Sequence, residues 1–311
     1  MSLSVGERDK PSRICRLKRG ACLATVTPMA EGEQTLERAS ESAGVGAMVR
    51  RTVRLFTMAA WTPTIVSWEA VRALFSTGKR GITIERAKHA WAIVSKFVLG
   101  VDVHLVRGQM PERHSKRARL IVSNHRTPLD VVSLMWLFGG HFLANHKTRV
   151  APVVGIAAIR MGTIFVDRED RRSGVNAIRA MRRALEGGES VIIFPEGTTY
   201  EGDEVRPFKG GAFVAAKALD LDVIPVGLAY RPGTAYFNES LGQHARRFLS
   251  RKRNPVWIAI GDPIPFPEDR KGAEDLIRSA VQAMVDEARA LANGGAPAGA
   301  LRPTNEPKET E

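Results

Sequence analysis

Apolar residues follow two spacings that alternate along positions 101–293. Short continuous apolar runs, such as 191–194, have the length of buried strands. Val175, Ile178, Met181 and Leu185 instead recur at helical spacing, and two glycines end that segment. The alternation predicts an α/β fold with a largely parallel central sheet flanked by helices. The predicted strands are 119–123, 142–145, 163–166, 191–194, 223–228 and 256–260, and the predicted helices are 128–137, 152–161, 175–185, 212–219 and 277–291.

Residues 46–100 are predicted to form two amphipathic helices ahead of this domain. They contain Trp61, Trp68 and Trp91 beside several Arg and Lys residues, a composition typical of a membrane-interface element. The apolar stretch at 55–68 contains Pro63 and is shorter than the 18 or so residues of a membrane span. Two interpretations therefore stay open, a helix that lies in the membrane interface and an ordinary helix that packs on the core.

The two ends of the chain differ from the middle. Residues 1–45 are polar and aperiodic, and residues 294–311 are rich in Gly, Pro and charged residues. Both are predicted to be disordered tails. The predicted organisation is a tail at 1–45, a membrane-association element at 46–100, an α/β domain at 101–293 and a second tail at 294–311.

The net charge of the chain limits the kinds of partner that we expect it to bind. It has 46 Lys and Arg against 33 Asp and Glu, a net charge of +13, and the stretch 50–119 alone has 14 basic against 4 acidic residues. A surface this basic attracts anionic phospholipid, an acidic carrier protein or nucleic acid. The sequence contains no nucleic-acid-binding motif that we recognise, so we expect no nucleic-acid partner. The two cysteines, Cys15 and Cys22, are too few for a disulfide framework or a four-ligand zinc site, and no metal is expected.

The first candidate for chemistry is the segment Asn124–Asp130, which follows a predicted strand. Thr127 is a favourable N-cap and Pro128 suits the first helical position, so Asp130 lies in the first turn and folds back toward His125. A carboxylate there would fix the imidazole tautomer and stabilise its charged form, which makes His125 a candidate general base. The alternative is structural, because Thr127 and Asp130 also resemble a capping box.

Three further clusters lie after or within predicted strands. Arg168 stands at the end of the strand at 163–166, where it could bind a phosphate or pair with a neighbouring acidic residue. Glu196 and Gly197 lie in a turn after the strand at 191–194, and Glu196 could bind a substrate hydroxyl or hold Arg168. Lys209 precedes a predicted helix whose free N–H groups favour an anion. Pro225 marks a buried strand, part of the core or the wall of an acyl-chain site.

In this order, the clusters resemble the motifs of the glycerolipid acyltransferase family, whose simplest members are bacterial 1-acylglycerol-3-phosphate acyltransferases. The family shows an NHxxxxD box, GxxFxxR, FPEGT and a VPV-like strand. Here these are Asn124–Asp130, Gly162–Arg168, Phe194–Thr198 and Ile224-Pro225-Val226, so the resemblance covers about residues 118–265.

The resemblance implies His125 as general base and Asp130 as its orienting carboxylate. It implies that Arg168, Glu196 and Gly197 bind a glycerol phosphate, and we add Thr198 and Lys209 as substrate-binding candidates. The expected reaction moves a fatty acyl group from acyl-CoA or acyl carrier protein, without a resident cofactor, to a lysophospholipid, most simply 1-acylglycerol 3-phosphate. Glycerol 3-phosphate and a lyso-aminolipid remain alternative acceptors.

The enzyme is expected at the cytoplasmic face of the membrane, as a peripheral or monotopic protein on an anionic surface. Two departures from the family pattern bear on this expectation. Family members often have Arg after FPEGT, where this chain has Thr199, and this removes a possible phosphate contact. They often have Ser where this chain has Thr127, which preserves a hydroxyl. A nucleic-acid-binding protein and a catalytically inactive membrane scaffold are the alternatives from other classes.

Overall fold

The computed structural model describes residues 44–75, 80–111, 118–150, 154–209, 213–214, 219, 221–266 and 270–294. The predicted tails therefore lie almost wholly outside the described residues, as do both cysteines and most of the predicted helix at 212–219.

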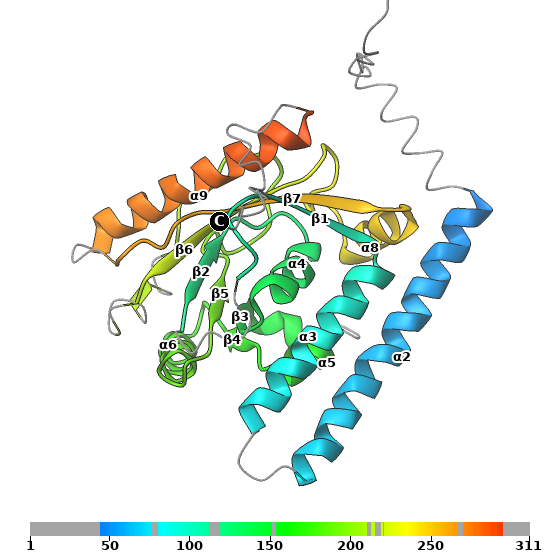
Figure 1. Ribbon diagram of the computed structural model, residues 1–311, viewed down its shortest axis with the longest axis horizontal. Coiled ribbons are helices and arrows are strands. Elements are labelled where there is room, and N and C mark those ends of the chain that lie inside the picture. Colours follow the sequence, from blue (N-terminus) through cyan, green and yellow to red (C-terminus); the bar gives the residue numbers. More distant parts are fainter. Residues whose placement is uncertain are drawn as a thin grey trace, which may run out of the picture. The chain divides into compact units, whose positions relative to one another are not determined.

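The described part contains a seven-stranded sheet with the order β1-β7-β6-β2-β5-β3-β4 (Figure 1). The strands β2 to β6 pair in parallel, whereas β7 runs antiparallel to β6 and β1 runs parallel to β7. The prediction of a largely parallel sheet is confirmed. The strands are β1 Val101–Arg107, β2 Leu120–Ser123, β3 His141–Asn145, β4 Ile164–Val166, β5 Val191–Ile193, β6 Val223–Ala229 and β7 Asn254–Ile260.

The helices cover the sheet on both sides, as Figure 1 shows. Three elements were not predicted: the strand β1, the helix α8 (Leu241–Ser250) and the 3₁₀ turn η1 (His146–Val150). The helices are α2 Val45–Phe75, α3 Arg80–Val98, α4 Leu129–Phe138, α5 Val154–Arg160, α6 Arg171–Glu186, α8 Leu241–Ser250 and α9 Arg270–Ala292, with a 3₁₀ turn, η1, at His146–Val150.

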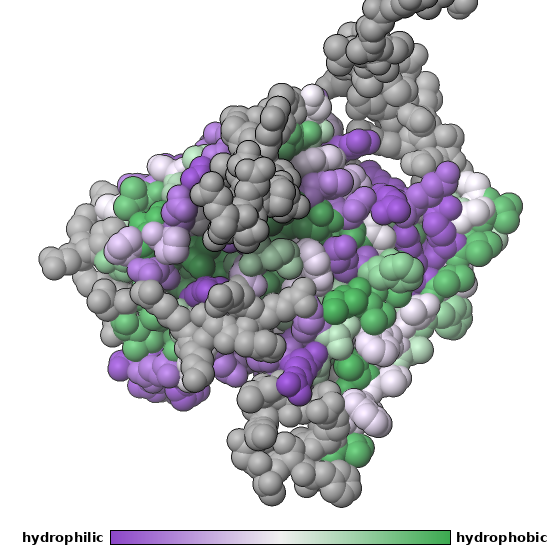
Figure 2. Space-filling view, viewed as in Figure 1, coloured by the Kyte–Doolittle hydropathy of each residue, from purple (hydrophilic) through white to green (hydrophobic). Residues whose placement is uncertain are grey.

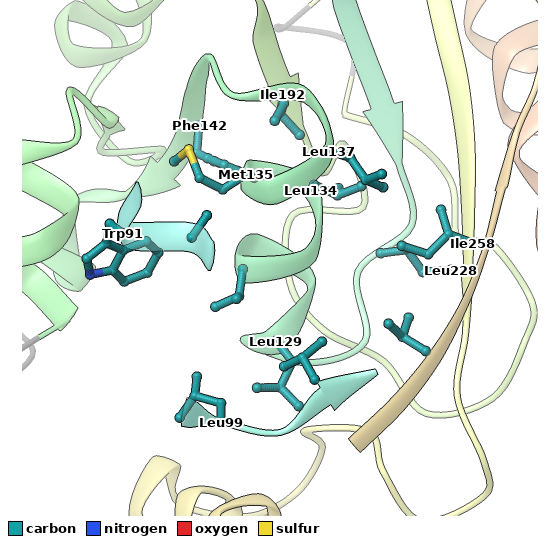
Figure 3. Packing of buried hydrophobic residues seen from close by; sticks show 14 of the residues in the cluster. Trp91, Leu99, Leu129, Leu134, Met135, Leu137, Phe142, Ile192, Leu228 and Ile258 are labelled. Carbon is teal, nitrogen blue, oxygen red and sulfur yellow. The ribbon is translucent and has the colours of Figure 1, made fainter. Parts of the chain in front are cut away.

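Most of the core falls into two clusters on opposite faces of the sheet, because successive side chains of a strand point to opposite faces, and a third, smaller cluster joins β6 and β7 to α9. In β2, Ile121 belongs to the cluster under α3 and α4, whereas Leu120 and Val122 belong to the cluster under α6 and α9. Figure 3 shows the first cluster, in which Trp91 of α3 and Leu134 of α4 are buried at 9% and 0% exposure. Every residue of β6 is buried, so Pro225 belongs to the core.

The two N-terminal helices are confirmed, and α2 is joined to α8 by two arginines. Arg54, 9% exposed, donates to the carbonyl oxygens of Leu249 at 3.0 Å, Arg251 at 2.6 Å and Lys252 at 3.0 Å. Arg50 donates to the Ser250 carbonyl at 2.8 and 2.9 Å. The last carbonyls of a helix lack intrahelical partners and carry partial negative charge, so these guanidinium groups cap α8.

We predict that Gly227→Ala destabilises the fold. A Cβ on Gly227 of β6 would lie 2.2 Å from the backbone carbon of Met284 and 2.2 Å from the backbone nitrogen of Val285, so α9 would have to move off the sheet. Overpacking of this kind costs about 1–3 kcal/mol. Gly174→Ala on α6 is the control, because nothing lies within 4 Å of its added Cβ. Urea unfolding should show a loss for the first variant only, and equal midpoints would contradict the tight packing.

Candidate active site

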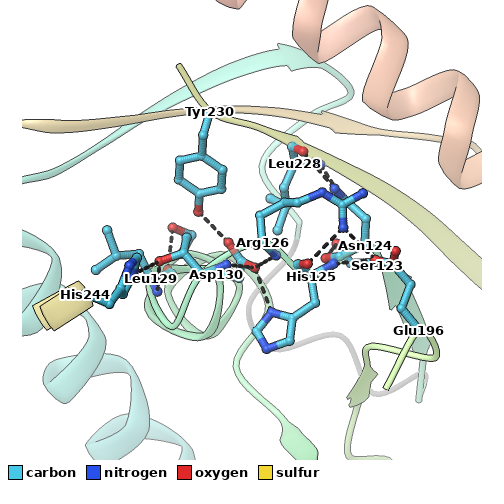
Figure 4. Close-up of polar contacts among 12 residues, drawn as sticks. Ser123, Asn124, His125, Arg126, Leu129, Asp130, Glu196, Leu228, Tyr230 and His244 are labelled. Atoms are coloured by element: carbon cyan, nitrogen blue, oxygen red, sulfur yellow. Dashed lines mark hydrogen bonds and ion pairs between the residues drawn. The ribbon is translucent and has the colours of Figure 1, made fainter. Parts of the chain in front are cut away.

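The candidate catalytic residues lie at the carboxyl ends of three neighbouring strands. His125 follows β2, Glu196 follows β5 on one side of it, and Tyr230 follows β6 on the other. Because these strands are parallel, their carboxyl ends share one edge of the sheet, where α/β proteins bind ligands. Figure 4 shows the side chains converging there.

His125 and Asp130 form the hydrogen-bonded pair expected from the sequence. His125 Nδ1 lies 2.8 Å from Asp130 Oδ2. A carboxylate can only accept, so Nδ1 carries the proton and the neutral ring keeps Nε2 as a base. Nε2 has no hydrogen-bond partner among the residues that the structure describes, and the His125 side chain is 20% exposed. The ring stacks on Phe194, with the centroids 4.1 Å apart, which fixes its plane.

The chain bends back between these residues through the Asp130 carboxylate. Oδ2 also accepts from the backbone N–H groups of Arg126 at 2.6 Å and Thr127 at 3.0 Å. This is one half of a capping box, so the structural and catalytic interpretations of Asp130 describe the same contacts. The expected cap by the Thr127 hydroxyl is poorly formed, because it is 3.5 Å from the Leu129 N–H and bonds His244 instead.

Two residues hold this loop in place: Tyr230, which the sequence did not single out, and Asn124, the first residue of the NHxxxxD box, to which the sequence assigned no role. Tyr230 donates its hydroxyl to Asp130 Oδ1 at 2.5 Å, and burial together with the neighbouring carboxylate raises the pKa of Tyr230 well above its usual value. Asn124 is fully buried and forms two hydrogen bonds with the backbone of Leu228, at 2.8 and 2.9 Å. Position alone could have indicated Tyr230, since it follows a strand of the same sheet edge.

Glu196 supports the loop from the other side and does not hold Arg168. Its side chain is fully buried, and it accepts from the His125 N–H at 2.8 Å, from Arg126 Nη1 at 2.9 Å and from the Arg206 N–H at 3.0 Å. The expected pairing with Arg168 is therefore wrong, because the arginine that Glu196 binds is Arg126. A carboxylate so enclosed supports the backbone of His125 in place of the expected contact with a substrate hydroxyl.

Arg168, Gly197 and Lys209 come together beside this network. Arg168 Nη1 donates to the Gly197 carbonyl at 2.5 Å. A Cβ on Gly197, whose φ is +85°, would lie 2.4 Å from Arg168 Nη1 and 3.0 Å from Lys209 Nζ, so both cations lie against this glycine. Burial lowers the pKa of Arg168. Neither cation has a carboxylate partner in the described part of the chain, and such a pair attracts an anion.

Thr198 is exposed and lines an open hollow of about 570 Å³ with Thr199, Tyr200 and residues 236–240. An oxyanion needs free N–H donors near His125. The N–H groups of Gly197 and of Asp130, at the start of α4, are occupied, because Gly197 donates to the Phe194 carbonyl and Asp130 to the Thr127 carbonyl, both at 3.0 Å. The N–H groups of Thr198 and Thr199 have no partner among the described residues, so they become the candidates.

One group in the described residues has donor atoms spaced to hold a metal ion. Glu85, His141 and Glu189 offer ligand atoms within 4.8 Å of one another. The ammonium group of Lys88, fully buried, already lies among them, 2.6 Å from Glu85 and 3.4 Å from His141 Nε2. Burial would raise the pKa of Glu85, but Lys88 and the Gly140 N–H outweigh it and lower that pKa. Glu85 belongs to α3, His141 begins β3 and Glu189 precedes β5, so the group lies at the sheet edge opposite His125.

The geometry at the carboxyl edge is that of a general base that activates the hydroxyl of an anionic substrate. Residues 105–229 match the family model described as Acyltransferase. The resemblance of this part of the chain to the acyltransferase family, which its four motifs predict, is confirmed, and the relatives described below are named as acyltransferases.

Its relatives agree with this assignment. A 1-acyl-sn-glycerol-3-phosphate acyltransferase of Neisseria gonorrhoeae is 27% identical over 228 residues, which cover 68% of this chain and 89% of the relative. A lyso-ornithine lipid O-acyltransferase of Pseudomonas aeruginosa is 29% identical over 227 residues, 70% of this chain and 85% of the relative. The crystal structure of the 1-acyl-sn-glycerophosphate (LPA) acyltransferase PlsC from Thermotoga maritima matches with a TM-score of 0.63 at 18% identity, covering 81% of this chain and 98% of that one. This match confirms the fold.

Arg126→Met should destabilise the protein by about 3–5 kcal/mol, because it leaves the buried Glu196 carboxylate without its cation. The side chains of Arg126 and Glu196 are 4% and 0% exposed. Arg182→Met breaks the Arg182–Glu186 pair on α6, whose members are 53% and 45% exposed, and should cost at most about 0.5 kcal/mol. Urea unfolding of both variants measures the difference, and similar losses would refute the supporting role of the buried pair.

Proposed function

We propose that this enzyme transfers a fatty acyl group from an acyl thioester to the free hydroxyl of a lysophospholipid, 1-acylglycerol 3-phosphate in the simplest case. The proposal rests on how close the base, His125, lies to the two cations, Arg168 and Lys209. Glu196 bonds the His125 N–H at 2.8 Å, and the next residue, Gly197, lies against the cations of Arg168 and Lys209. A base and an anion site this close fit a phosphate and a hydroxyl on one glycerol.

In the proposed reaction, His125 Nε2 removes the proton of the acceptor hydroxyl while its oxygen attacks the thioester carbonyl. Asp130 stabilises the imidazolium through Nδ1. The tetrahedral oxyanion is bound by the N–H groups of Thr198 and Thr199. The carbon–sulfur bond then breaks, and the leaving thiolate takes the proton from His125. Products are an ester and a free thiol, and the base returns to its neutral form.

Two acceptors other than 1-acylglycerol 3-phosphate share part of this chemistry. Glycerol 3-phosphate has the phosphate but lacks the first acyl chain. A lyso-ornithine lipid, the acceptor named for the relative from Pseudomonas aeruginosa, has a hydroxyl but no phosphate. The Arg168–Lys209 pair favours a phosphate over the ornithine head group, which itself carries an amine. Acyl-CoA and acyl carrier protein both present the donor as a thioester, and either would react by the same steps.

His125→Ala should reduce acyl transfer by at least about 10³-fold, because it removes the general base. Asp130→Asn should lower kcat strongly while the enzyme still binds its substrates. Thioester consumption is measured with 1-acylglycerol 3-phosphate, glycerol 3-phosphate and a lyso-ornithine lipid as acceptors. Near-normal activity of His125→Ala would refute the mechanism, and preference for the lyso-ornithine lipid would refute the proposed acceptor.

We also propose that α2 and α3 hold the enzyme on an anionic membrane. No helix in the described residues is both long enough and apolar enough to cross a bilayer. Apolar side chains do lie along the outer edge of α2 (Figure 2), with Val53 57% and Phe56 73% exposed, and Phe97 of α3 is 85% exposed. Such a surface suits an interfacial helix.

The structure changes which residues would face the membrane. Among the tryptophans of residues 46–100, Trp91 is 9% exposed and packs in the core, whereas Trp68 is 59% exposed. Arg54 and Lys88 are also buried, so they are not available to lipid head groups. The apolar edge of α2, more than a belt of aromatic and basic residues, is therefore the proposed contact.

Replacing Val53 and Phe56 by Ser should lower binding to vesicles that contain anionic phospholipid by at least about tenfold, since each buried apolar side chain contributes about 1.5–3 kcal/mol. Leu276→Ser on α9 is the control, because its side chain is 49% exposed but lies outside α2 and α3. Flotation with labelled vesicles measures binding. Equal loss in the control, or none in the double variant, would contradict the proposal.

A further inference from the structure

A second histidine–carboxylate pair lies behind the catalytic loop. His244 of α8 has Nδ1 2.9 Å from Glu239 Oε1 and Nε2 2.8 Å from Thr127 Oγ1. Hydroxyl, imidazole and carboxylate thus follow in the order of a hydrolytic triad. Thr127 and His244 are both 0% exposed, so no substrate reaches this hydroxyl. The His244–Glu239 pair can therefore only hold Thr127 in position.

The protons of this chain can be assigned from its neighbours. Arg247 Nη2 donates its two N–H groups to Glu239 at 2.5 Å and to the Ala235 carbonyl at 2.7 Å, so it has none left for His244 Nδ1, 3.0 Å away. His244 Nδ1 therefore carries its own proton and donates to Glu239. Burial is the main cause that lowers the pKa of His244, and together with the charges of Arg247 and Arg251 it outweighs the opposing hydrogen bond and charge of Glu239. The ring is neutral, and Nε2 accepts from the Thr127 hydroxyl.

Thr127, which His244 holds in place, is in turn hydrogen-bonded to Asp130. Its N–H donates to Asp130 Oδ2 at 3.0 Å, and its carbonyl accepts from the Asp130 N–H at 3.0 Å. The same Oδ2 binds His125 Nδ1 at 2.8 Å. A shift of Thr127 would thus move the carboxylate that orients the base.

We propose that His244, held by Glu239, is a positioning residue that fixes Thr127 and, through it, the Asp130 carboxylate against His125. Both residues lie outside positions 105–229, which match the family model. The activity measurement below rests on the proposed function, whereas the spectroscopic one does not.

His244→Phe keeps a ring in the cavity but removes both nitrogens. We expect kcat to fall about 10- to 100-fold with the KM for the acceptor unchanged, because a misplaced base slows chemistry without altering the anion site. His244→Gln, whose side-chain carbonyl can accept from Thr127, should recover most of the loss. Thr127→Val removes the hydroxyl at constant shape, and combined with His244→Phe it should cost no more than the worse single change.

Phe248→Leu is the control for packing. Phe248 contacts the His244 ring, with the centroids 5.3 Å apart, but is not part of the hydrogen-bonded chain. This variant should lower the melting temperature and leave kcat within about twofold of the wild type. A folded His244→Phe enzyme with wild-type kcat would overturn the proposal. So would multiplying losses in the double variant, since His244 would then act independently of Thr127.

Nitrogen NMR of the ¹⁵N-histidine-labelled protein tests the same link without substrate. The chain has seven histidines, and the His244 signals are those missing in His244→Phe. We expect a neutral ring protonated on Nδ1 at pH 7.5. An imidazolium, or a ring protonated on Nε2, would overturn the proposal. If the wild-type enzyme acylates none of the three acceptors, the proposed function fails, and the NMR result still decides the role of His244.

Discussion

The carboxylate of Asp130 is the point on which the catalytic loop depends. It is fully buried, and it accepts hydrogen bonds from His125 Nδ1, from the N–H groups of Arg126 and Thr127, and from the Tyr230 hydroxyl. A buried charge is tolerated only when such donors replace water. The donors come from three successive residues of the loop and from Tyr230, which follows β6, so the carboxylate joins the base, the helix start and the end of the neighbouring strand into one rigid unit.

Because the central strands are parallel, the carboxyl and amino edges of the sheet gather different sets of residues. The carboxyl edge gathers His125, Arg168 and Glu196 from loops that follow three separate strands. The amino edge gathers a partly buried charged cluster around the buried Lys88, which joins α3 to the residues at the starts of β3 and β5. Catalysis and attachment of the N-terminal helices therefore occupy opposite ends of the same strands and need not compete for the same residues.

Much of this arrangement could be predicted from the sequence because it depends on local spacing. The strands at 120–123, 191–193 and 223–229 are apolar runs, and Thr127 with Pro128 indicates the helix start that returns Asp130 to His125. The strand at 256–260 is predicted, but neither the antiparallel direction of β7 nor the neighbouring β1 could be predicted, since strand order depends on contacts between residues about 150 positions apart.

The same limit applies to the site residues. The motif places Arg168 and Glu196 near each other, but only the fold shows that Arg126, four residues from Asp130, is the cation that Glu196 binds. Tyr230 and His244 are single residues without a motif, and their roles arise from long-range packing.

The two arginines that cap α8 give α2 an unusual place in the architecture. If α2 separated from the domain, the carbonyl groups at the end of α8 would lose their hydrogen bonds to Arg50 and Arg54, and the last turn of that helix would fray. His244 lies in the same helix, two turns earlier. The position of α2 therefore bears on the active site, because α2 holds the end of α8, and His244 of α8 contacts Thr127 of the catalytic loop.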